Sequence, residues 1–81
     1  MKLNNEKYDK IFIDCFSVNK VKLQKNLEYD SIPEWDSVGH MTLIAALEEA
    51  FDIVFEMDDI IDFSSYKVGK EILKKYKVNI S

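Results

Sequence analysis

Two Asp-Ser pairs are the first candidates for chemistry in this chain, because a serine hydroxyl can carry an ester. In the second pair, the Asp36 carboxylate can accept the amide hydrogen of Val38 or Gly39, which predicts a helix that begins at Ser37. Free amides and the positive end of the helix dipole favour an anion there, so a phosphate ester on Ser37 Oγ would be stabilised. A serine is also an ordinary residue at a helix start, so position alone does not identify its role.

The other serines lack part of this context. Asp30-Ser31 is followed by Ile32-Pro33, and proline disfavours a helical residue before it, so no helix can begin cleanly at Ser31. The remaining serines do not follow an aspartate: Ser17, Ser64, Ser65 and Ser81. Ser37 is therefore the one candidate that has the whole context.

His40, three residues after Ser37, could suggest a nucleophile and its base. Helical spacing places His40 on the core side, near Leu43 and Leu47, and Trp35 and His40 occupy the positions of a hydrophobic staple. A catalytic pair also needs an orienting third group and an oxyanion site, and neither is apparent. We expect His40 to be packed, or to contact a group carried by Ser37, and not to act as a catalytic base.

Cys15 and the aspartates after Met57 are interpreted as structural. Cys15 lies on the apolar face of the predicted first helix, where it should pack in the core. Asp58, Asp59 and Asp62 lack the spacing and the glycine of a calcium-binding loop. A short solvated helix is favoured instead, and Asp58 or Asp59 is expected to open it. A single cysteine and a single histidine give no zinc spacing, so no metal site is expected.

The size of the chain favours a carrier or binding module over an enzyme. Its 81 residues, of which 47% are hydrophobic, suit one domain over residues 1–81 with one compact core. A core and a walled catalytic pocket rarely fit in this length, so no enzymatic activity is expected. No apolar stretch resembles a signal peptide or a membrane span, so a cytoplasmic monomer without membrane insertion is expected.

Apolar residues recur with helical spacing along most of the chain, which predicts an all-α fold. Helices are expected at about 5–17, 37–51 and 65–76, with a short one near 57–63. The segment 17–36 has no sustained period and is expected to form a long loop, with or without one short turn. The predicted architecture is a small four-helix bundle, with three longer helices and one short helix, and a long loop between the first two.

The predicted helix 37–51 has two apolar stripes. One side carries the residues expected to face the core: Leu43, Ile44, Leu47, Ala50 and Phe51. Val38, Met41 and Ala45 fall on nearly the opposite side, flanked by Thr42, Glu48 and Glu49. Because a helix in a small bundle cannot bury both sides, the second stripe is expected to contact a basic partner surface. Alternatively, these are ordinary exposed apolar residues.

Charge is segregated along the sequence, although the net charge is only −4. Residues 28–62 contain eleven acidic side chains and no Lys or Arg, whereas residues 1–27 and 63–81 are both net positive. An acidic middle segment repels nucleic acid and attracts basic protein surfaces. The alternative is a solvated acidic face that serves solubility.

The segment 35–41, Trp-Asp-Ser-Val-Gly-His-Met, followed by Leu-Glu-Glu-Ala-Phe at 47–51, resembles the Asp-Ser-Leu motif and second helix of acyl carrier proteins. The resemblance covers essentially the whole chain. It implies that a phosphopantetheinyl transferase attaches 4′-phosphopantetheine from coenzyme A to Ser37, where the arm's thiol holds an acyl or aminoacyl thioester. It also implies that Asp36 supports the transferase's magnesium ion and the phosphate. Implied partner-binding residues are Val38, Met41, Thr42, Ala45, Glu48, Glu49 and Asp59.

The chain departs from this family at Gly39 and Thr42, where carriers of fatty-acid synthesis usually have acids. The resemblance implies a biosynthetic pathway of the fatty-acid, polyketide, polysaccharide or D-alanyl type. The departures suggest a dedicated carrier in a specialised pathway, such as surface-polysaccharide, lipid or secondary-metabolite assembly, and Gly39 is also similar to D-alanyl carrier proteins. The implied partners are an acyl- or aminoacyl-activating ligase and an acyltransferase or synthase. The alternative is an unmodified helical adaptor that binds a basic partner; a small hydrolase is the least favoured.

Overall fold

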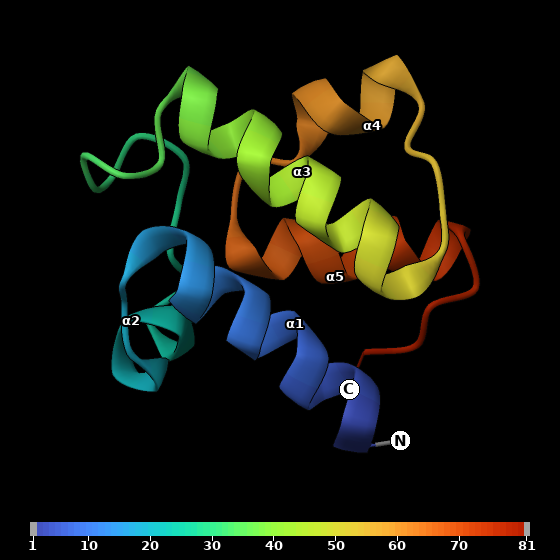
Figure 1. Cartoon of the computed structure of the whole chain (residues 1–81), viewed down its shortest axis with the longest axis horizontal. Coiled ribbons are helices and arrows are strands. Elements are labelled where there is room, and N and C mark those ends of the chain that lie inside the picture. The colour runs from blue at the N-terminus through green and yellow to red at the C-terminus, as the bar shows by residue number, and fades with distance from the viewer. Residues whose placement is uncertain (1, 81) are drawn as a thin grey trace.

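The computed structural model describes residues 2–80, and side-chain burial from residue 4, and this part of the chain forms five helices. They are α1 (Lys2–Phe16), α2 (Lys20–Gln24), α3 (Ser37–Phe51), α4 (Met57–Asp62) and α5 (Tyr66–Lys75). Figure 1 shows α3 and α4 in the upper half of the molecule and α1 and α2 in the lower half. Within residues 2–80, no helix combines the length and the apolar character needed to cross a bilayer.

The prediction of a mainly helical fold is confirmed, but the four-helix bundle with a long loop is not. The segment predicted as loop contains α2, which begins after Asn19, whose side chain accepts the amide of Lys22 at 3.1 Å. Within this helix only Leu23 is buried, so five residues produce no apolar period that a sequence pattern could reveal. Residues 25–36 then lead to α3 through turns.

The bounds of the other helices follow their caps. Helix α3 occupies the predicted range, and α5 begins after Ser65, whose hydroxyl accepts the amide of Val68 at 3.1 Å. The prediction that Asp58 or Asp59 opens α4 is wrong, because the N-cap is Glu56 and both aspartates lie within the first turn of the helix.

An aromatic core fixes the place where α3 begins. Tyr8, Phe12 and Phe16 lie on one face of α1, at four-residue spacing, and all are buried. Trp35, two residues before α3, is also fully buried, and its ring stacks on Phe16 with a centroid distance of 5.1 Å. Because Trp35 cannot leave the core without exposing this surface, the first turn of α3 is held at a defined place.

Candidate functional site

Ser37 is the first residue of α3, and its side chain is exposed. Asp36 has extended backbone angles and accepts the amide hydrogen of Gly39 through Oδ1 at 2.9 Å, which confirms the predicted helix cap. The hydroxyl of Ser37 therefore stands at the positive end of a 15-residue helix, beside the carboxylate that caps it.

Ser31, the serine of the other Asp-Ser pair, lies in a different environment. Its hydroxyl donates to the backbone carbonyl of Glu28 at 2.6 Å, within a turn and not at a helix end. Asp30, which precedes it, has a left-handed backbone with φ of 65° and does not cap a helix. The two pairs are alike in sequence and unlike in structure, so Ser31 provides a matched control for Ser37.

Close packing around position 39 explains why a glycine is found there. A Cβ atom at Gly39 would lie 1.9 Å from the backbone oxygen of Glu34 and 3.3 Å from the ring of Phe16. The loop before α3 thus packs directly on the helix backbone, and no side chain fits between them. The absence of an acid at this position follows from this close approach, whatever partner the chain binds.

His40 joins three parts of the chain beside Ser37. Its Nδ1 accepts the indole hydrogen of Trp35 at 3.0 Å, and its Nε2 lies 2.7 Å from the backbone oxygen of Ile60 in α4. Since Nδ1 is an acceptor, the hydrogen is on Nε2, which donates to Ile60. His40 points toward the core, as predicted, and both of its ring nitrogens have partners other than Ser37.

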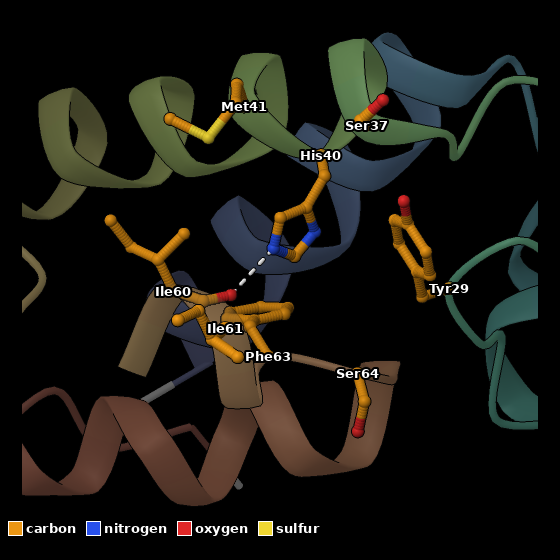
Figure 2. A pocket seen from close by; sticks show the side chains of 8 residues that line it. All are labelled: Tyr29, Ser37, His40, Met41, Ile60, Ile61, Phe63 and Ser64. Atoms are coloured by element: carbon orange, nitrogen blue, oxygen red, sulfur yellow. Dashed lines mark hydrogen bonds between the residues drawn. The ribbon is translucent and has the colours of Figure 1, made fainter. Parts of the chain in front are cut away.

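A cavity of about 320 Å³ opens next to Ser37, between α3 and α4. Figure 2 shows Ser37 at the edge of this cavity, with His40 reaching across it to the backbone of Ile60. Its walls are mostly apolar, and the residues that line it are Tyr29, Ser37, His40, Met41, Ile60, Ile61, Phe63 and Ser64. An apolar group linked to Ser37 could enter it without crossing the core.

The cavity was not predicted residue by residue from the sequence. Tyr29 comes from the loop, and Ile60, Ile61 and Phe63 come from around α4, so only tertiary packing brings them to Ser37. No local period joins them. The one available signal was the pairing of the apolar residues Ile60 and Ile61 in a short helix, which cannot bury both side chains in the core.

The predicted apolar stripe of α3 lies on the surface. Val38 is 75% and Met41 54% exposed, and Ala45 is exposed on the same side, as the helical spacing predicts. Thr42 is also exposed, and its hydroxyl donates to the carbonyl of Val38 at 3.0 Å. These four residues form one side of α3, next to Ser37.

The three acidic residues in the predicted partner-binding set differ in their surroundings. Glu49 is exposed and points away from the core, whereas Glu48 is half-buried and accepts the amide of Phe55 at 2.9 Å. Asp59 is only 4% exposed, so its carboxylate does not lie on the surface as a partner contact should. We therefore leave Asp59 out of the docking surface and assign Glu48 a structural contact as well.

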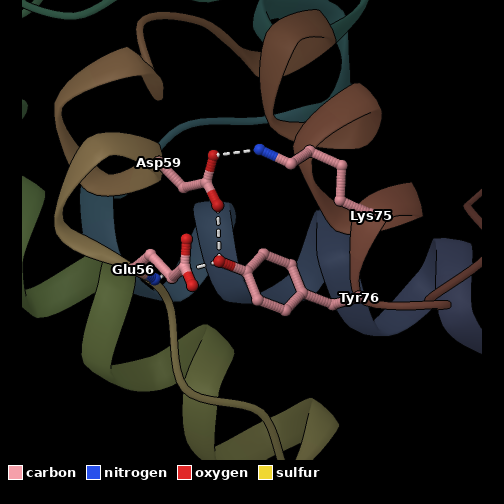
Figure 3. A network of polar contacts seen from close by, with 4 residues as sticks. All are labelled: Glu56, Asp59, Lys75 and Tyr76. Carbon is pink, nitrogen blue, oxygen red and sulfur yellow. Dashed lines mark hydrogen bonds and ion pairs between the residues drawn. The ribbon is translucent and has the colours of Figure 1, made fainter.

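The Asp59 carboxylate joins α4 to the end of α5 (Figure 3). It accepts from Lys75 Nζ at 2.6 Å and from the Tyr76 hydroxyl at 2.5 Å, and that hydroxyl accepts the amide of Glu56 at 2.9 Å. The hydrogen bond from Lys75, and then that from Tyr76, lower the pKa of Asp59. The same contact raises the pKa of Lys75.

A second buried carboxylate, that of Asp9, contacts the first residue of α5. Asp9 accepts the hydroxyl hydrogen of Tyr66 at 2.5 Å, while the hydroxyl of Tyr8 donates to the backbone oxygen of Tyr66 at 2.6 Å. Burial is the main reason that the pKa values of both tyrosines are raised. Tyr66 and then Asp9 raise the pKa of Tyr8 further, and Asp9 raises that of Tyr66. These contacts fix α1 to α5 and lie outside the cavity at Ser37.

Among the described residues, no group of three His, Cys, Asp or Glu side chains is arranged to hold a metal ion. Comparisons of the chain with family models, with curated proteins and with solved structures found no match. The residues and their geometry are therefore the basis for the function proposed below.

Proposed function

We propose that this protein is a carrier that bears 4′-phosphopantetheine on Ser37 and passes acyl or aminoacyl intermediates between partner enzymes. When bound, the arm supplies a terminal thiol that holds the intermediate as a thioester. A phosphopantetheinyl transferase would install it, and an activating ligase and an acyltransferase or synthase would load and unload it. The protein itself would have no catalytic role in this proposal.

The observation that carries the proposal is the setting of one hydroxyl. Ser37 is exposed at the first turn of α3, beside the capping carboxylate of Asp36, and borders an apolar cavity. The helix start favours the negative charge of a phosphodiester, and open solvent around it leaves room for a transferase. Ser31, in contrast, does not begin a helix, and its hydroxyl is hydrogen-bonded to the backbone carbonyl of Glu28.

The cavity supports a carrier role because it could shelter part of the cargo. Its walls come from Met41, Ile60, Ile61 and Phe63, so a hydrocarbon portion would be removed from water there. His40 holds α4 against α3 through its bond to the Ile60 carbonyl, and thus sets the width of the entrance. A reactive thioester that is partly covered is also less exposed to hydrolysis.

The exposed side of α3 supports docking of the proposed partners. Val38, Met41 and Ala45 supply apolar contact area close to Ser37, and Glu49 adds an exposed negative charge. A partner with a small apolar pocket and basic side chains around it would complement this surface. Such an interface is small, which suits a carrier that must leave each enzyme after one step.

The test is intact-mass spectrometry after incubation with coenzyme A and a broad-specificity phosphopantetheinyl transferase. We expect the protein and its Ser31→Ala variant to gain one phosphopantetheine, and the Ser37→Ala variant to gain none. A wild-type protein that gains no mass, or a Ser37→Ala variant that is still modified, would refute the proposal. Circular dichroism of each variant checks that the helices are intact.

An unmodified adaptor for a basic partner is the second candidate, and the exposed acid of α3 favours it. This candidate predicts that the Ser37→Ala variant still binds the basic partner, whereas the Glu49→Lys variant does not. Glu49 is the better choice for this test because Glu48 also holds the amide of Phe55, so that a change there would disturb the fold.

A further inference from the structure

Five lysines form a continuous strip on α2, α5 and the segment after α5. We call this set the basic strip: Lys20, Lys67, Lys70, Lys74 and Lys77. Lys20, Lys67 and Lys70 line one cavity of about 380 Å³, while Lys67, Lys70 and Lys74 line a second of about 260 Å³. Lys74 and Lys77 line a third of about 300 Å³. Each lysine thus shares a cavity with the next.

The geometry of α5 gathers these charges on one side. At about 100° per residue, Lys67, Lys70 and Lys74 fall within about 60° of one another around the helix. Tyr66, Ile72 and Leu73 face the core instead. Three positive charges on one side repel each other, so this arrangement has a cost in the isolated protein that an anionic partner would remove.

Two acids, Glu71 and Asp9, line the cavities of the strip, and against five lysines they offset its positive charge only in part. Glu71 pairs with Lys74 at 3.3 Å, but both side chains are mostly exposed, so the pair contributes little to the stability of the fold. Asp9 lines the first cavity, where its carboxylate already accepts the hydroxyl of Tyr66. Lys70 lies over the ring of Tyr66 at 4.6 Å from the centroid, which orients its charge without cancelling it.

The second cavity is an apolar groove between these lysines. Its lining includes Val68, which is half-buried, and Ile80, whose side chain packs from the C-terminal segment. An occupant that satisfied the whole site would place apolar side chains in this groove and acidic side chains on either side. An amphipathic acidic helix has this pattern, because its residues three and four apart match the spacing of the lysines on α5.

We propose that the basic strip binds an acidic helical segment of a partner protein. A bilayer meets a protein as a plane and would leave the groove unfilled, and the acidic remainder of the chain would be repelled by anionic lipids. A nucleic acid would meet the same repulsion. A helical segment is small enough to contact the strip alone.

This binding is independent of the site at Ser37. The three cavities of the strip share no residue with the cavity at Ser37, and none of the strip lysines lies on α3 or α4. The protein could therefore be held by one partner through α5 while α3 stays accessible to another. A Ser37→Ala variant should bind the acidic segment as the wild type does, which keeps the two proposals separable.

The experiment is a fluorescence anisotropy titration with a dye-labelled synthetic helix that carries Glu at three- and four-residue spacing with Leu beside it. We expect saturable binding that weakens as salt is added. The double variant Lys67→Glu/Lys74→Glu should weaken it by about tenfold, which is about 1.4 kcal/mol of binding free energy. Lys22→Glu/Lys25→Glu changes the net charge equally outside the strip and should stay within about twofold of wild type.

Nuclear magnetic resonance locates the contact. We expect amide shifts to change in residues 67–77 and at Lys20, and to stay unchanged along α3. Equal binding of a helix with Lys in place of Glu, equal weakening by both double variants, or shifts along α3 would each overturn the proposal. So would binding of phosphatidylglycerol vesicles or a single-stranded oligonucleotide in the absence of binding to the acidic helix.

Discussion

At the scale of single residues, His40 has the most constrained chemistry near Ser37. It accepts from Trp35, which is fully buried, and donates to the Ile60 carbonyl, so one imidazole provides the hydrogen-bond partner of both groups. The loop before α3, α3 itself and α4 are therefore tied together at one ring.

We expect the His40 hydrogen to be on Nε2 at neutral pH, which nitrogen-15 chemical shifts of the imidazole can check. His40→Asn should keep an acceptor near the Trp35 indole and lose the bond to α4, and His40→Gln should do the reverse. Either variant should lower the free energy of unfolding by about 1–3 kcal/mol, because a buried group loses its partner. A hydrogen found on Nδ1 would contradict this arrangement.

Individual residues could be predicted to different degrees from the sequence. The cap at Asp36 and the exposure of Val38 and Met41 follow from local helix rules, and the structure confirms both. The need for glycine at position 39 could not be predicted, because it depends on the distant backbone of Glu34 approaching the helix. The burial of Asp59 could not be predicted either, because its two partners, Lys75 and Tyr76, lie at the end of α5 and are brought to it only by the fold.

At the scale of elements, α4 is the short helix whose position depends most on polar contacts. Lys75 and Tyr76 hold its Asp59 from one side, and His40 holds the Ile60 carbonyl from the other. Because Ile60 and Ile61 line the cavity at Ser37, these contacts also decide how closely α4 covers it.

Acid should loosen this attachment of α4. The pKa of Asp59 in the folded protein lies below its unfolded value of about 3.9, so the ion pair stabilises the fold fully above that pH. Its contribution is lost as the pH falls below about 4, through the range between the two values. We expect Asp59→Asn to lower the melting temperature at pH 7, and the difference from wild type to shrink below pH 4.

The matched control is Glu71→Gln, which removes an exposed acid whose partner is also exposed. It should change the melting temperature little at either pH. A difference between wild type and Asp59→Asn that stays constant down to pH 2 would show that the carboxylate does not stabilise α4 through its charge.

The elements show where a sequence pattern carries information and where it does not. Helices α1, α3 and α5 have several buried residues at helical spacing, and their bounds were predicted to within a few residues. Helix α2 has a capping Asn19 and only Leu23 in the core, so it was predicted as loop. The pattern also gave no account of how α4 would be attached.

At the scale of the whole molecule, the acidic side chains of α3 and α4 and the lysines of the basic strip lie on different elements, as they lie in different segments of the sequence. The acidic residues 28–62 form the segment that includes α3 and α4, whereas α2 and α5 carry the basic strip. One small domain thus presents two surfaces of opposite sign. The sequence predicted the acidic surface, but the basic strip required α2 and α5 to be brought together by the fold.

The half-buried thiol of Cys15 allows one colorimetric thiol assay to follow both attachment of the arm to Ser37 and exposure of Cys15. Burial, and then the neighbouring Asp14, raise its pKa, so it should react slowly with a disulfide reagent at neutral pH. It is the chain's single cysteine, so an arm on Ser37 would add one fast-reacting thiol. We expect a biphasic trace whose fast amplitude counts the molecules that carry an arm with a free thiol, and whose slow rate reports how readily Cys15 becomes exposed. Cys15→Ser should abolish the slow phase alone; a fast phase before the arm is attached to Ser37 would contradict this.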